Sequence, residues 1–359
     1  MKALILAGGR ATRLRPITHT LNKHLIPLAN KPMIFHAIEK VVEAGITDIG
    51  ININEGDREM PLALGDGSRF GARFTYLEQR GGAQGLAHTI KNAKDSGFLD
   101  GPFLMYLGDN IILGSIRPLV DKFIAGGYHC LLALSRVKEP QRFGVPEIRD
   151  GKIVRVVEKP QIPPSDFAIT GIYLYDRQAL DAVDLIRPSW RGEYEITDVH
   201  QYYIDRGQNI GYQEITGWWK DTGKPEDLLE GNQLLLNEMN GKPSVIEGYV
   251  HPDATIQGPV VIGKRTRIGP EVMIRGPVII GENCEIEKSF IGPHTSIGND
   301  VRIHHAEIEH AVVLDRVSIN CDSRIVDSII GMDASVTAAS ASRPSGHKIV
   351  VGDHAMVEL

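Results

Sequence analysis

The stretch MKALILAGGRATRLRP, residues 1–16, determines how the N-terminal half of the chain is organised. A run of apolar residues from Ala3 to Ala7 ends at Gly8-Gly9, and a basic segment follows at once. A short apolar run that stops at glycine is typical of a buried strand ending in a turn, and it is too short for a secretion signal. The stretch therefore predicts a first strand over Lys2–Ala7 with a glycine turn at its carboxyl end.

The basic side chains around this turn contrast with the formal net charge of the whole chain, which is −6. The first 38 residues contain no acid and six cationic side chains: Lys2, Arg10, Arg13, Arg15, Lys23 and Lys31. Glycine lets a backbone approach a phosphate and donate its N–H groups, while arginine and lysine neutralise negative charge. The pattern favours a site for a small polyanion, although a surface loop with solvated arginines would have the same composition.

The overall composition excludes several classes of protein. A chain of 359 residues is long enough for two domains. Its 42% hydrophobic and 23% charged residues are typical of a soluble globular protein, and no apolar run approaches the length of a membrane span. A pI near 6.1 argues against nucleic acid as a bulk partner. The three cysteines, Cys130, Cys284 and Cys321, are expected to be reduced thiols in a cytoplasmic protein.

Short apolar runs alternate with amphipathic segments from residue 1 to about residue 240. Further strands are expected at Ile49–Ile53, Phe74–Leu77, Phe103–Leu107, Cys130–Val137, Ile153–Val157 and Ile169–Tyr175. Helices are expected from a start at Pro32 to an end at Gly45, and at Leu86–Ala93, Ile116–Ala125, Thr197–Asp205 and Pro225–Met239. This alternation predicts an α/β fold with a Rossmann-like mixed sheet. Ligands of such sheets bind beyond the carboxyl ends of the strands, where the turns at Gly8-Gly9 and Gly108-Asp109-Asn110 both fall.

The apolar period changes near residue 245. Aliphatic residues then recur every six positions, without a break at Val250, Ile256, Ile262, Ile268, Ile274, Ile280 and Ile286, and after short slips at Ile291, Ile297, Ile303, Val313, Ile319, Ile325, Ile330 and Val336. A six-residue period fits neither a helix nor a flat sheet, and it is typical of a parallel β-helix with three short faces per coil. With Asn240–Ser244 as the linker, the sequence predicts domains over residues 1–240 and 245–359.

The glycine turn contains neither the dinucleotide fingerprint GxGxxG nor the phosphate loop GxxxxGK[ST]. A different set of short motifs runs along nearly the whole chain: Gly8–Pro16, Lys23–Pro27, Asn30–Met33, Glu78-Gln79, Gly85–Ala87, Leu107–Asn110, Phe143–Val145, Val157–Pro160, Thr170–Tyr173, Arg191–Asp198 and Trp219–Gly223. In order and content they resemble the sugar-1-phosphate nucleotidylyltransferases. The resemblance is greatest to the long-form glucose-1-phosphate thymidylyltransferases, which carry a C-terminal left-handed β-helix.

The resemblance implies a reaction and a set of catalytic residues. The oxygen of glucose 1-phosphate would attack the α-phosphorus of dTTP, and pyrophosphate would leave, so positioning and charge neutralisation would dominate. Asp109 and Asp221 match the family's Mg²⁺-binding carboxylates, and Mg²⁺ prefers such hard oxygen ligands. Arg13 and Lys23 would hold the triphosphate, and Lys159 would hold the phosphate of the sugar. Without the family context, Asp109 could be a turn residue, Asp221 a helix-flanking acid and Lys159 an exposed loop charge.

The resemblance also implies the residues around each substrate. The nucleotide-binding set is Gly8, Gly9, Ala11, Thr12, Arg13, Lys23, Gln79, Gly85 and Asp109. The sugar-phosphate-binding set is Gly144, Glu158, Lys159, Thr170 and Tyr173. Glu193 and Glu195 either contact the sugar or favour the dipole of the helix that they precede, and Trp219 either packs near the site or fills the core.

Three places depart from the family pattern. Arg10-Ala11 replaces a small residue and glycine, and Ala11 is expected to be tolerated only with a negative φ; Arg10 is then a further candidate phosphate contact. His24 stands where the family has Gln. The segment Arg80–Gln84 is richer in glycine than expected, so Gln84 competes with Gln79 as the residue that contacts the base.

The role of the second half is left open by the sequence. Such β-helices assemble into homo-oligomers, trimers among them, and His304, His305 and His310 raise the alternative of an acyltransferase site. A terminal segment around Ile349–Val351 is expected to cap the last coil. Other nucleotide and sugar-phosphate pairs (UTP, GTP with mannose 1-phosphate, or an amino-sugar phosphate) and a non-catalytic scaffold are the rival functions. Deleting residues from Ser244 onward is expected to leave the chemistry measurable.

Overall fold

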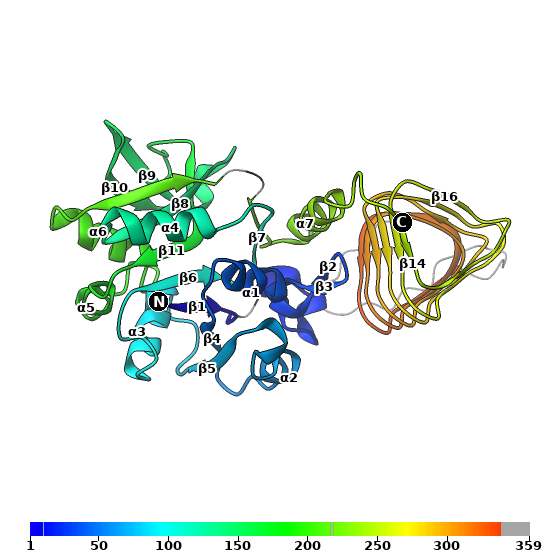
Figure 1. Ribbon diagram of the computed structural model, residues 1–359, viewed down its shortest axis with the longest axis horizontal. Helices are drawn as coiled ribbons and strands as arrows, with labels where there is room; N and C mark the ends of the chain where they lie inside the picture. The colour runs from blue at the N-terminus through cyan, green and yellow to red at the C-terminus, as the bar shows by residue number, and fades with distance from the viewer. Residues whose placement is uncertain (10, 216, 218, 339–359) are drawn as a thin grey trace. The chain divides into compact units, whose positions relative to one another are not determined.

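The computed structural model describes residues 1–9, 11–215, 217 and 219–338 of the chain (Figure 1). It divides into two compact units by contacts between residues. Unit 1 contains Met1–Arg10 and Met33–Asp221, and unit 2 contains Ala11–Pro32 and Thr222–Leu359. Arg10 and residues 339–359, with the expected terminal cap, lie outside the described residues. The basic segment after the glycine turn thus groups with the C-terminal half, while the sequence-based boundary between 240 and 245 stays a prediction.

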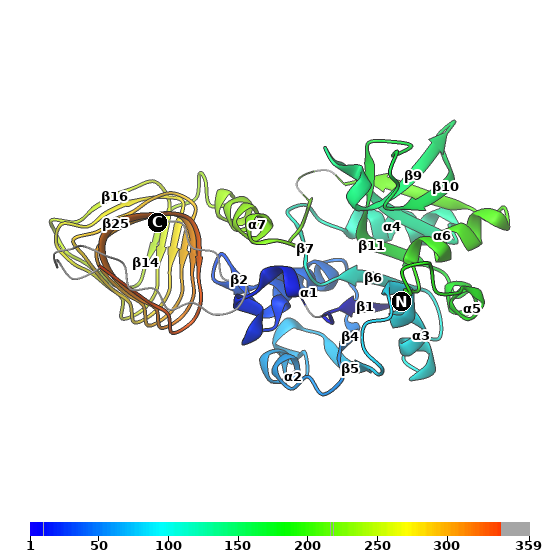
Figure 2. The same ribbon diagram turned by 180° about the vertical axis from the view of Figure 1, so that it is seen from behind.

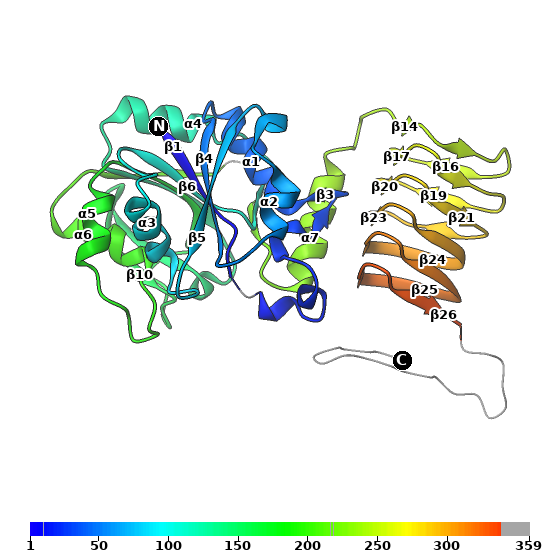
Figure 3. The same ribbon diagram turned by 90° about the horizontal axis from the view of Figure 1, so that it is seen from below.

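Unit 1 is built around a seven-stranded mixed sheet, as the alternation of strands and helices predicts (Figure 3). Its order is β12 (Ile210–Glu214), β8 (Cys130–Arg136), β11 (Phe167–Tyr175), β6 (Phe103–Leu107), β1 (Lys2–Leu6), β4 (Asp48–Asn54) and β5 (Arg73–Gln79). All neighbours pair in parallel except β11, which is antiparallel to both β8 and β6. The carboxyl ends of β1, β6 and β5 therefore lie on the same edge, and this edge carries the residues of interest.

Helices cover this sheet. They are α1 (Met33–Glu43), α2 (Glu59–Leu64), α3 (Leu86–Asp95), α4 (Arg117–Gly126), α5 (Ala179–Leu185) and α6 (Ile196–Asp205), with a short turn η4 (Ser68–Phe70). Apolar residues of α3, α5 and α6, such as Ile90, Val183 and Val199, share one buried cluster with Leu4 and Met105 of the sheet. The periodic apolar residues thus explain both the helices and the face that each one buries.

Two small two-stranded sheets complete unit 1. In one, β7 (Asn110–Ile112) pairs antiparallel with β13 (Trp219–Asp221), and in the other β9 (Gly144–Arg149) pairs with β10 (Lys152–Glu158) after a short turn η5 (Pro140–Arg142). The sequence patterns did not predict β7, β9, β12, β13, α2 or α5. Several of these elements have only three to seven residues, too few for a period to show.

The C-terminal sheet, Val245–Thr337, consists of parallel strands in successive coils (Figure 3). Thr255 pairs with Met273 and Val260 with Val278, in both cases eighteen residues further along the chain. Each coil therefore contains three of the six-residue repeats, and the repeated aliphatic residues form one buried core. Its strands are β14 (Val245–Ile246), β15 (Tyr249–Val250), β16 (Thr255–Gln257), β17 (Val260–Ile262), β18 (Arg267–Ile268), β19 (Met273–Arg275), β20 (Val278–Ile280), β21 (Glu285–Glu287), β22 (Phe290–Ile291), β23 (Thr295–Ile297), β24 (Arg302–Val313), β25 (Ser318–Ile330) and β26 (Ser335–Thr337).

The other described elements of unit 2 are one helix and those of the basic segment. Helix α7 (Pro225–Asn237) precedes the C-terminal sheet. The basic segment, Ala11–Pro32, folds into the short turns η1 (Thr12–Leu14), η2 (Ile17–His19) and η3 (Lys23–Leu25), then a hairpin of β2 (Pro27–Leu28) and β3 (Lys31–Pro32). Strand β2 and helix α7 lie side by side (Figure 2).

Two whole-chain expectations can be compared with the described residues. No helix among them is both long and apolar enough to cross a membrane. All three cysteines are buried free thiols, as the sequence predicts. Burial raises the pKa of both Cys130 and Cys284 above the usual value, which makes these thiols poor nucleophiles.

Candidate active site

The glycine turn sits where β1 ends in unit 1. The backbone N–H of Gly9 donates to Oδ1 of Asn54 at 2.9 Å, and Nδ2 of Asn54 donates to the Gly9 carbonyl at 3.2 Å. A Cβ at Gly8 would lie 3.2 Å from the same Oδ1 and 3.7 Å from Oε1 of Gln79. The turn is therefore held by the end of β4, and Gly8 leaves its backbone open to a ligand.

Gln79 lies at the end of β5 beside this turn. Its side chain is buried, Nδ2 of Asn52 donates to its Oε1 at 3.4 Å, and its Nε2 lies 3.1 Å from Nδ1 of His88. The amide of the competing residue, Gln84, instead contacts the Gly81 carbonyl at 3.5 Å. The structure thus brings Gln79, not Gln84, together with Gly8.

Gly85 begins α3 with a φ of 101°. A Cβ there would lie 2.5 Å from the carbonyl oxygen of Tyr194, so only glycine fits without movement of the backbone. Tyr194 is fixed on both sides, because its N–H donates to Gln84 at 2.8 Å and its carbonyl accepts from Ala87 at 3.1 Å. The turn before α3 and the segment before α6 are therefore joined backbone to backbone.

The pairing of β7 with β13 brings the two candidate metal-binding residues close together along the backbone. Asp221 lies opposite Asn110 in this pair, and Asp109 is the residue before Asn110. Nδ2 of Asn110 donates to Oδ1 of Asp109 at 2.9 Å, and Oδ1 of Asn110 accepts from Nε1 of Trp219 at 2.5 Å. Two acidic residues 112 positions apart in sequence are thus close along the backbone, and carboxylate oxygens suit a hard divalent cation.

The donor set at this place indicates how a cation would be held. Within the described residues, no group of three or more His, Cys, Asp or Glu side chains could hold a metal ion by itself. A magnesium-type ion keeps several waters and binds through one or two carboxylates plus substrate phosphates. The pair Asp109 and Asp221 fits that kind of site and does not fit a closed structural metal site.

Three residues of the expected sugar-phosphate site, Gly144, Glu158 and Lys159, gather around the partly buried Glu158 carboxylate. Glu158 pairs with Gly144 across β9 and β10, and its carboxylate lies 3.7 Å from Nζ of Lys159 and 3.9 Å from the Arg191 guanidinium. Burial raises the pKa of Glu158, and the neighbouring Lys159 charge opposes that rise. Arg191 also contacts Glu195 at 3.3 Å. Lys159 is about half exposed, so its ammonium is accessible to a phosphate.

Two members of the expected sugar site lie elsewhere in the core. Thr170 is fully buried in β11 and its hydroxyl donates to the Ala133 carbonyl at 3.0 Å. Tyr173 is almost fully buried and packs against Tyr175 and His200. The structure therefore gives both side chains a packing role, and their contact with a sugar stays a prediction.

Arg13 and Lys23 belong to unit 2. A Cβ built on Gly223 would lie 3.2 Å from the Arg13 guanidinium, which therefore rests against the backbone just after β13. Lys23 begins the turn η3, and the side chain of Asn22 caps that turn by accepting from the N–H of His24 at 3.0 Å. His24 is buried at this cap, so the residue that departs from the family pattern has a structural place here.

The expectation for Ala11 is wrong. Its φ is 45°, in the left-handed region, and it precedes η1, whose first residue is Thr12. The Ala11 carbonyl accepts from Oγ1 of Thr18 at 2.8 Å, which helps to hold this conformation. A Cβ in the left-handed region costs roughly 1–2 kcal/mol, so the alanine is tolerated at a cost rather than avoided.

We expect Ala11→Gly to stabilise the protein by about 0.5–1 kcal/mol, since relief of the strained backbone exceeds the added entropy of the unfolded chain. Chemical denaturation followed by circular dichroism measures the change. The matched control is Ala125→Gly in α4, which should lower stability by about 0.5–1 kcal/mol. A loss of stability in Ala11→Gly would contradict the assignment of strain.

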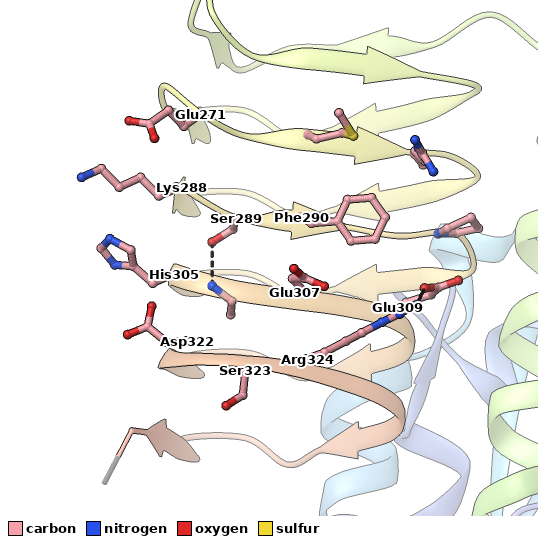
Figure 4. A pocket seen from close by; sticks show the side chains of 14 residues that line it. Glu271, Lys288, Ser289, Phe290, His305, Glu307, Glu309, Asp322, Ser323 and Arg324 are labelled. Atoms are coloured by element: carbon pink, nitrogen blue, oxygen red, sulfur yellow. Dashed lines mark hydrogen bonds and ion pairs between the residues drawn. The ribbon is translucent and has the colours of Figure 1, made fainter. Parts of the chain in front are cut away.

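The histidines behind the acyltransferase alternative do not converge on one place. His304 contacts Glu287 at 3.7 Å and His310 contacts Asp327 at 2.5 Å. His305 lines a groove of about 900 Å³ on the outer face of the C-terminal sheet, between Lys288 and Asp322 of the neighbouring coils (Figure 4). The groove is therefore a surface of mixed charge, and acyl transfer there stays a prediction.

The comparisons with known proteins decide the family. The nucleotidyl transferase family model matches residues 2–238, which include both candidate metal carboxylates. The chain belongs to the nucleotidyl transferase family. A model of the GMPPB C-terminal domain matches residues 274–358.

Relatives of this nucleotidyl transferase match over its full length. It is 43% identical over 363 residues to the low-salt glycan biosynthesis nucleotidyltransferase Agl11 of Haloferax volcanii, with all of both chains covered. It is 44% identical over 362 residues to a glucose-1-phosphate thymidylyltransferase of Streptomyces antibioticus, covering 100% of this chain and 99% of the relative.

Shorter relatives and solved structures match about two thirds of the nucleotidyl transferase. A glucose-1-phosphate thymidylyltransferase of Neisseria gonorrhoeae is 38% identical over 67% of this chain and 84% of its own. The solved structure of a Bacillus anthracis protein described as a glucose-1-phosphate thymidylyltransferase, in complex with sucrose, is 41% identical with a TM-score of 0.61, covering 65% of this chain and 94% of that one.

Sequence reasoning missed several residues of the nucleotidyl transferase site. Arg191 organises the carboxylates around Glu158, and His88 orients Gln79. Asn110 joins Asp109, Trp219 and the backbone of Gly171. Asn110 stands inside a quoted motif and could have been found there, whereas nothing local marks His88, which sits in an ordinary amphipathic helix.

Proposed function

We propose that the protein transfers the thymidylyl group of dTTP to glucose 1-phosphate, producing dTDP-glucose and pyrophosphate. The observation that carries the proposal is the pairing of β7 with β13, which puts Asp221 opposite Asn110, the residue that follows Asp109. The full-length relative from Streptomyces antibioticus, 44% identical and named for this activity, supports the choice of substrates.

The charged side chains suit a displacement between two polyanions. Arg13 and Lys23 bind the triphosphate and oppose the charge that develops on the leaving pyrophosphate, while Lys159 holds the attacking phosphate in line. Asp109 and Asp221 hold Mg²⁺, which when bound neutralises charge on the phosphates. No nucleophilic serine or cysteine is required, since the sugar phosphate supplies the nucleophile.

Two neutral groups and one carboxylate select the substrates. Gln79 hydrogen-bonds the edge of the pyrimidine, because His88 and Asn52 fix its buried amide. The backbone at Gly8 and Gly85 lies against the base, and a Cβ at either glycine would crowd a neighbour, Asn54 at 3.2 Å and Tyr194 at 2.5 Å. Glu158, held by Lys159 and Arg191, accepts hydrogen bonds from sugar hydroxyls.

The C-terminal sheet is part of the same proposed enzyme. We infer that it is a left-handed parallel β-helix, supported by the eighteen-residue pairing and the inward aliphatic residues. Its role is assembly into a homo-oligomer, with trimers as one arrangement, and the enzyme works in the cytoplasm. Neither nucleic acid nor a membrane is a partner.

Pyrophosphate release from a panel of nucleotides and sugar phosphates tests this function. We expect the highest kcat/KM with dTTP and glucose 1-phosphate, above UTP, GTP with mannose 1-phosphate, and amino-sugar phosphates. Gln79→Leu should lower kcat/KM for dTTP roughly 10- to 100-fold through loss of hydrogen bonds in a buried pocket. Gln84→Leu is the control and should stay near wild type. A preference for another pair would assign that substrate instead, and no turnover with any pair would favour a non-catalytic scaffold.

A further inference from the structure

Asn232 lies in the middle of α7 with its side chain fully buried, although its amide is polar. Every polar atom of that amide has a partner. Oδ1 accepts from the backbone N–H of Ala29 at 2.8 Å and from Oγ of Ser296 at 2.9 Å, and Nδ2 donates to the His294 carbonyl at 3.1 Å. One side chain therefore joins the basic segment Ala11–Pro32 to the C-terminal sheet.

The contact at Ala29 falls on a strained turn. Ala29 and Asn30 form the two-residue loop between β2 and β3, with φ values of 48° and 58°. Such a loop favours Asn-Gly, so alanine at its first position needs support from the surroundings. Asn30 makes a second connection between the basic segment and the C-terminal sheet, because its Nδ2 donates a hydrogen bond to the Ile297 carbonyl in β23 at 2.6 Å.

Apolar packing extends the same connection. Leu28, fully buried, lies against Gly231 of α7, where a Cβ would be 3.3 Å from its Cδ1. Leu229 of α7 shares a cluster with Val312 and Leu314 of the C-terminal sheet and with Ile17 and Leu21 of the basic segment. The segment is thus fixed on one side by α7 and the sheet together.

We propose that Asn232 is a positioning residue for the nucleotide. By fixing the hairpin turn at Ala29, it sets the place of η3, which ends four residues earlier, and of Lys23, six residues earlier. It thereby makes the triphosphate-binding segment depend on the C-terminal sheet. The inference rests on the proposed function for the role of Lys23. It predicts an effect on the nucleotide and not on the sugar phosphate, because Lys159 and Glu158 belong to unit 1.

Three variants of the full-length protein test the proposal. Asn232→Leu has nearly the same size and leaves the Ala29 N–H without its acceptor. Asn232→Asp keeps the acceptor for Ala29 and Ser296 but loses the donor to His294. Asn299→Leu is the matched control, since Asn299 accepts from the backbone of Glu282 within the sheet and does not reach the basic segment.

We expect Asn232→Leu to raise KM for dTTP roughly tenfold relative to Asn299→Leu, with KM for glucose 1-phosphate changed less than twofold. Asn232→Asp should restore KM for dTTP to near the wild-type value even where its thermal midpoint falls. Equal rises in both KM values, or no rescue by aspartate, would overturn the proposal. If Asn232→Leu does not fold, Asn30→Ala serves instead. It removes the hydrogen bond to the Ile297 carbonyl and should raise KM for dTTP alone.

Hydrogen–deuterium exchange separates this inference from the proposed function. In the nucleotide-free protein, peptides covering residues 26–32 should exchange faster in Asn232→Leu than in wild type, and peptides of β8 and β11 should not change. This result is expected whatever substrate the enzyme uses. Unchanged exchange at residues 26–32 would overturn the positioning role of Asn232 even in an active thymidylyltransferase. Faster exchange in an inactive protein would support that role and reject the proposed function.

Discussion

Asp109→Asn is expected to lower kcat roughly 10²–10³-fold, the loss seen when a group that stabilises charge in a transition state is removed. The change removes one negative charge and keeps the shape of the side chain. Its carbonyl oxygen can still accept from Nδ2 of Asn110, the bond that now measures 2.9 Å, so β7 and its pairing with β13 should survive. The loss then reflects the metal site and not the fold.

The measurement is Mg²⁺-dependent pyrophosphate release with thermal unfolding in parallel. Asp150→Asn is the control, because Asp150 is an exposed turn residue with a φ of 50°, a conformation that asparagine accepts readily. Asp109→Asn should retain the wild-type thermal midpoint and require more Mg²⁺ for its residual rate. Near-normal turnover at limiting Mg²⁺ would remove Asp109 from the metal site.

Deletion of residues 244–359 is expected to lower kcat/KM for dTTP at least about 100-fold, since several buried polar groups lose their partners at once. Asn232 would lose its hydrogen bonds to Ser296 and His294, and Asn30 would lose its hydrogen bond to the Ile297 carbonyl. Leu229 would lose the apolar cover of Val312 and Leu314. The chemistry should remain measurable after such a deletion, as the sequence predicts, but at this lower level.

A chain ending at Arg316 is the matched control for the deletion. It keeps Ser296, Ile297, Val312 and Leu314, and therefore keeps most of the support for the basic segment. Its kcat/KM for dTTP should stay within about tenfold of wild type. Wild-type activity in the chain ending at residue 243 would show that the segment is held by unit 1 alone.

The regular parts of this fold could be predicted from sequence because their periods are long. The first strand, the helix after Pro32 and all the strands expected in the first half appear within one or two residues of their predicted bounds. The six-residue repeat predicted the coils of the C-terminal sheet, and the aliphatic residues of that repeat are buried. Each of these patterns is local, repeated and tied to burial.

The parts that could not be predicted depend on contacts far apart in sequence. The pairing of β7 with β13 involves three residues from each strand, so neither strand has a recognisable period. The positive φ of Ala11 results from its surroundings and opposes its own preference. The association of the basic segment with the C-terminal half has no local sequence pattern at all, because hydrogen bonds to Asn232 and Ile297 carry it.

The grouping of the basic segment with the C-terminal half also has a consequence for how the protein is made. Ala29 and Asn232 are 203 residues apart, and Asn30 and Ile297 are 267 residues apart. At ordinary translation rates, the second distance corresponds to roughly 10–50 s between synthesis of the two partners. During that time the segment has left the ribosome without the surface on which it rests. The nascent chain can therefore complete the basic segment only after Ile297 has been made, although that segment lies near its N-terminus.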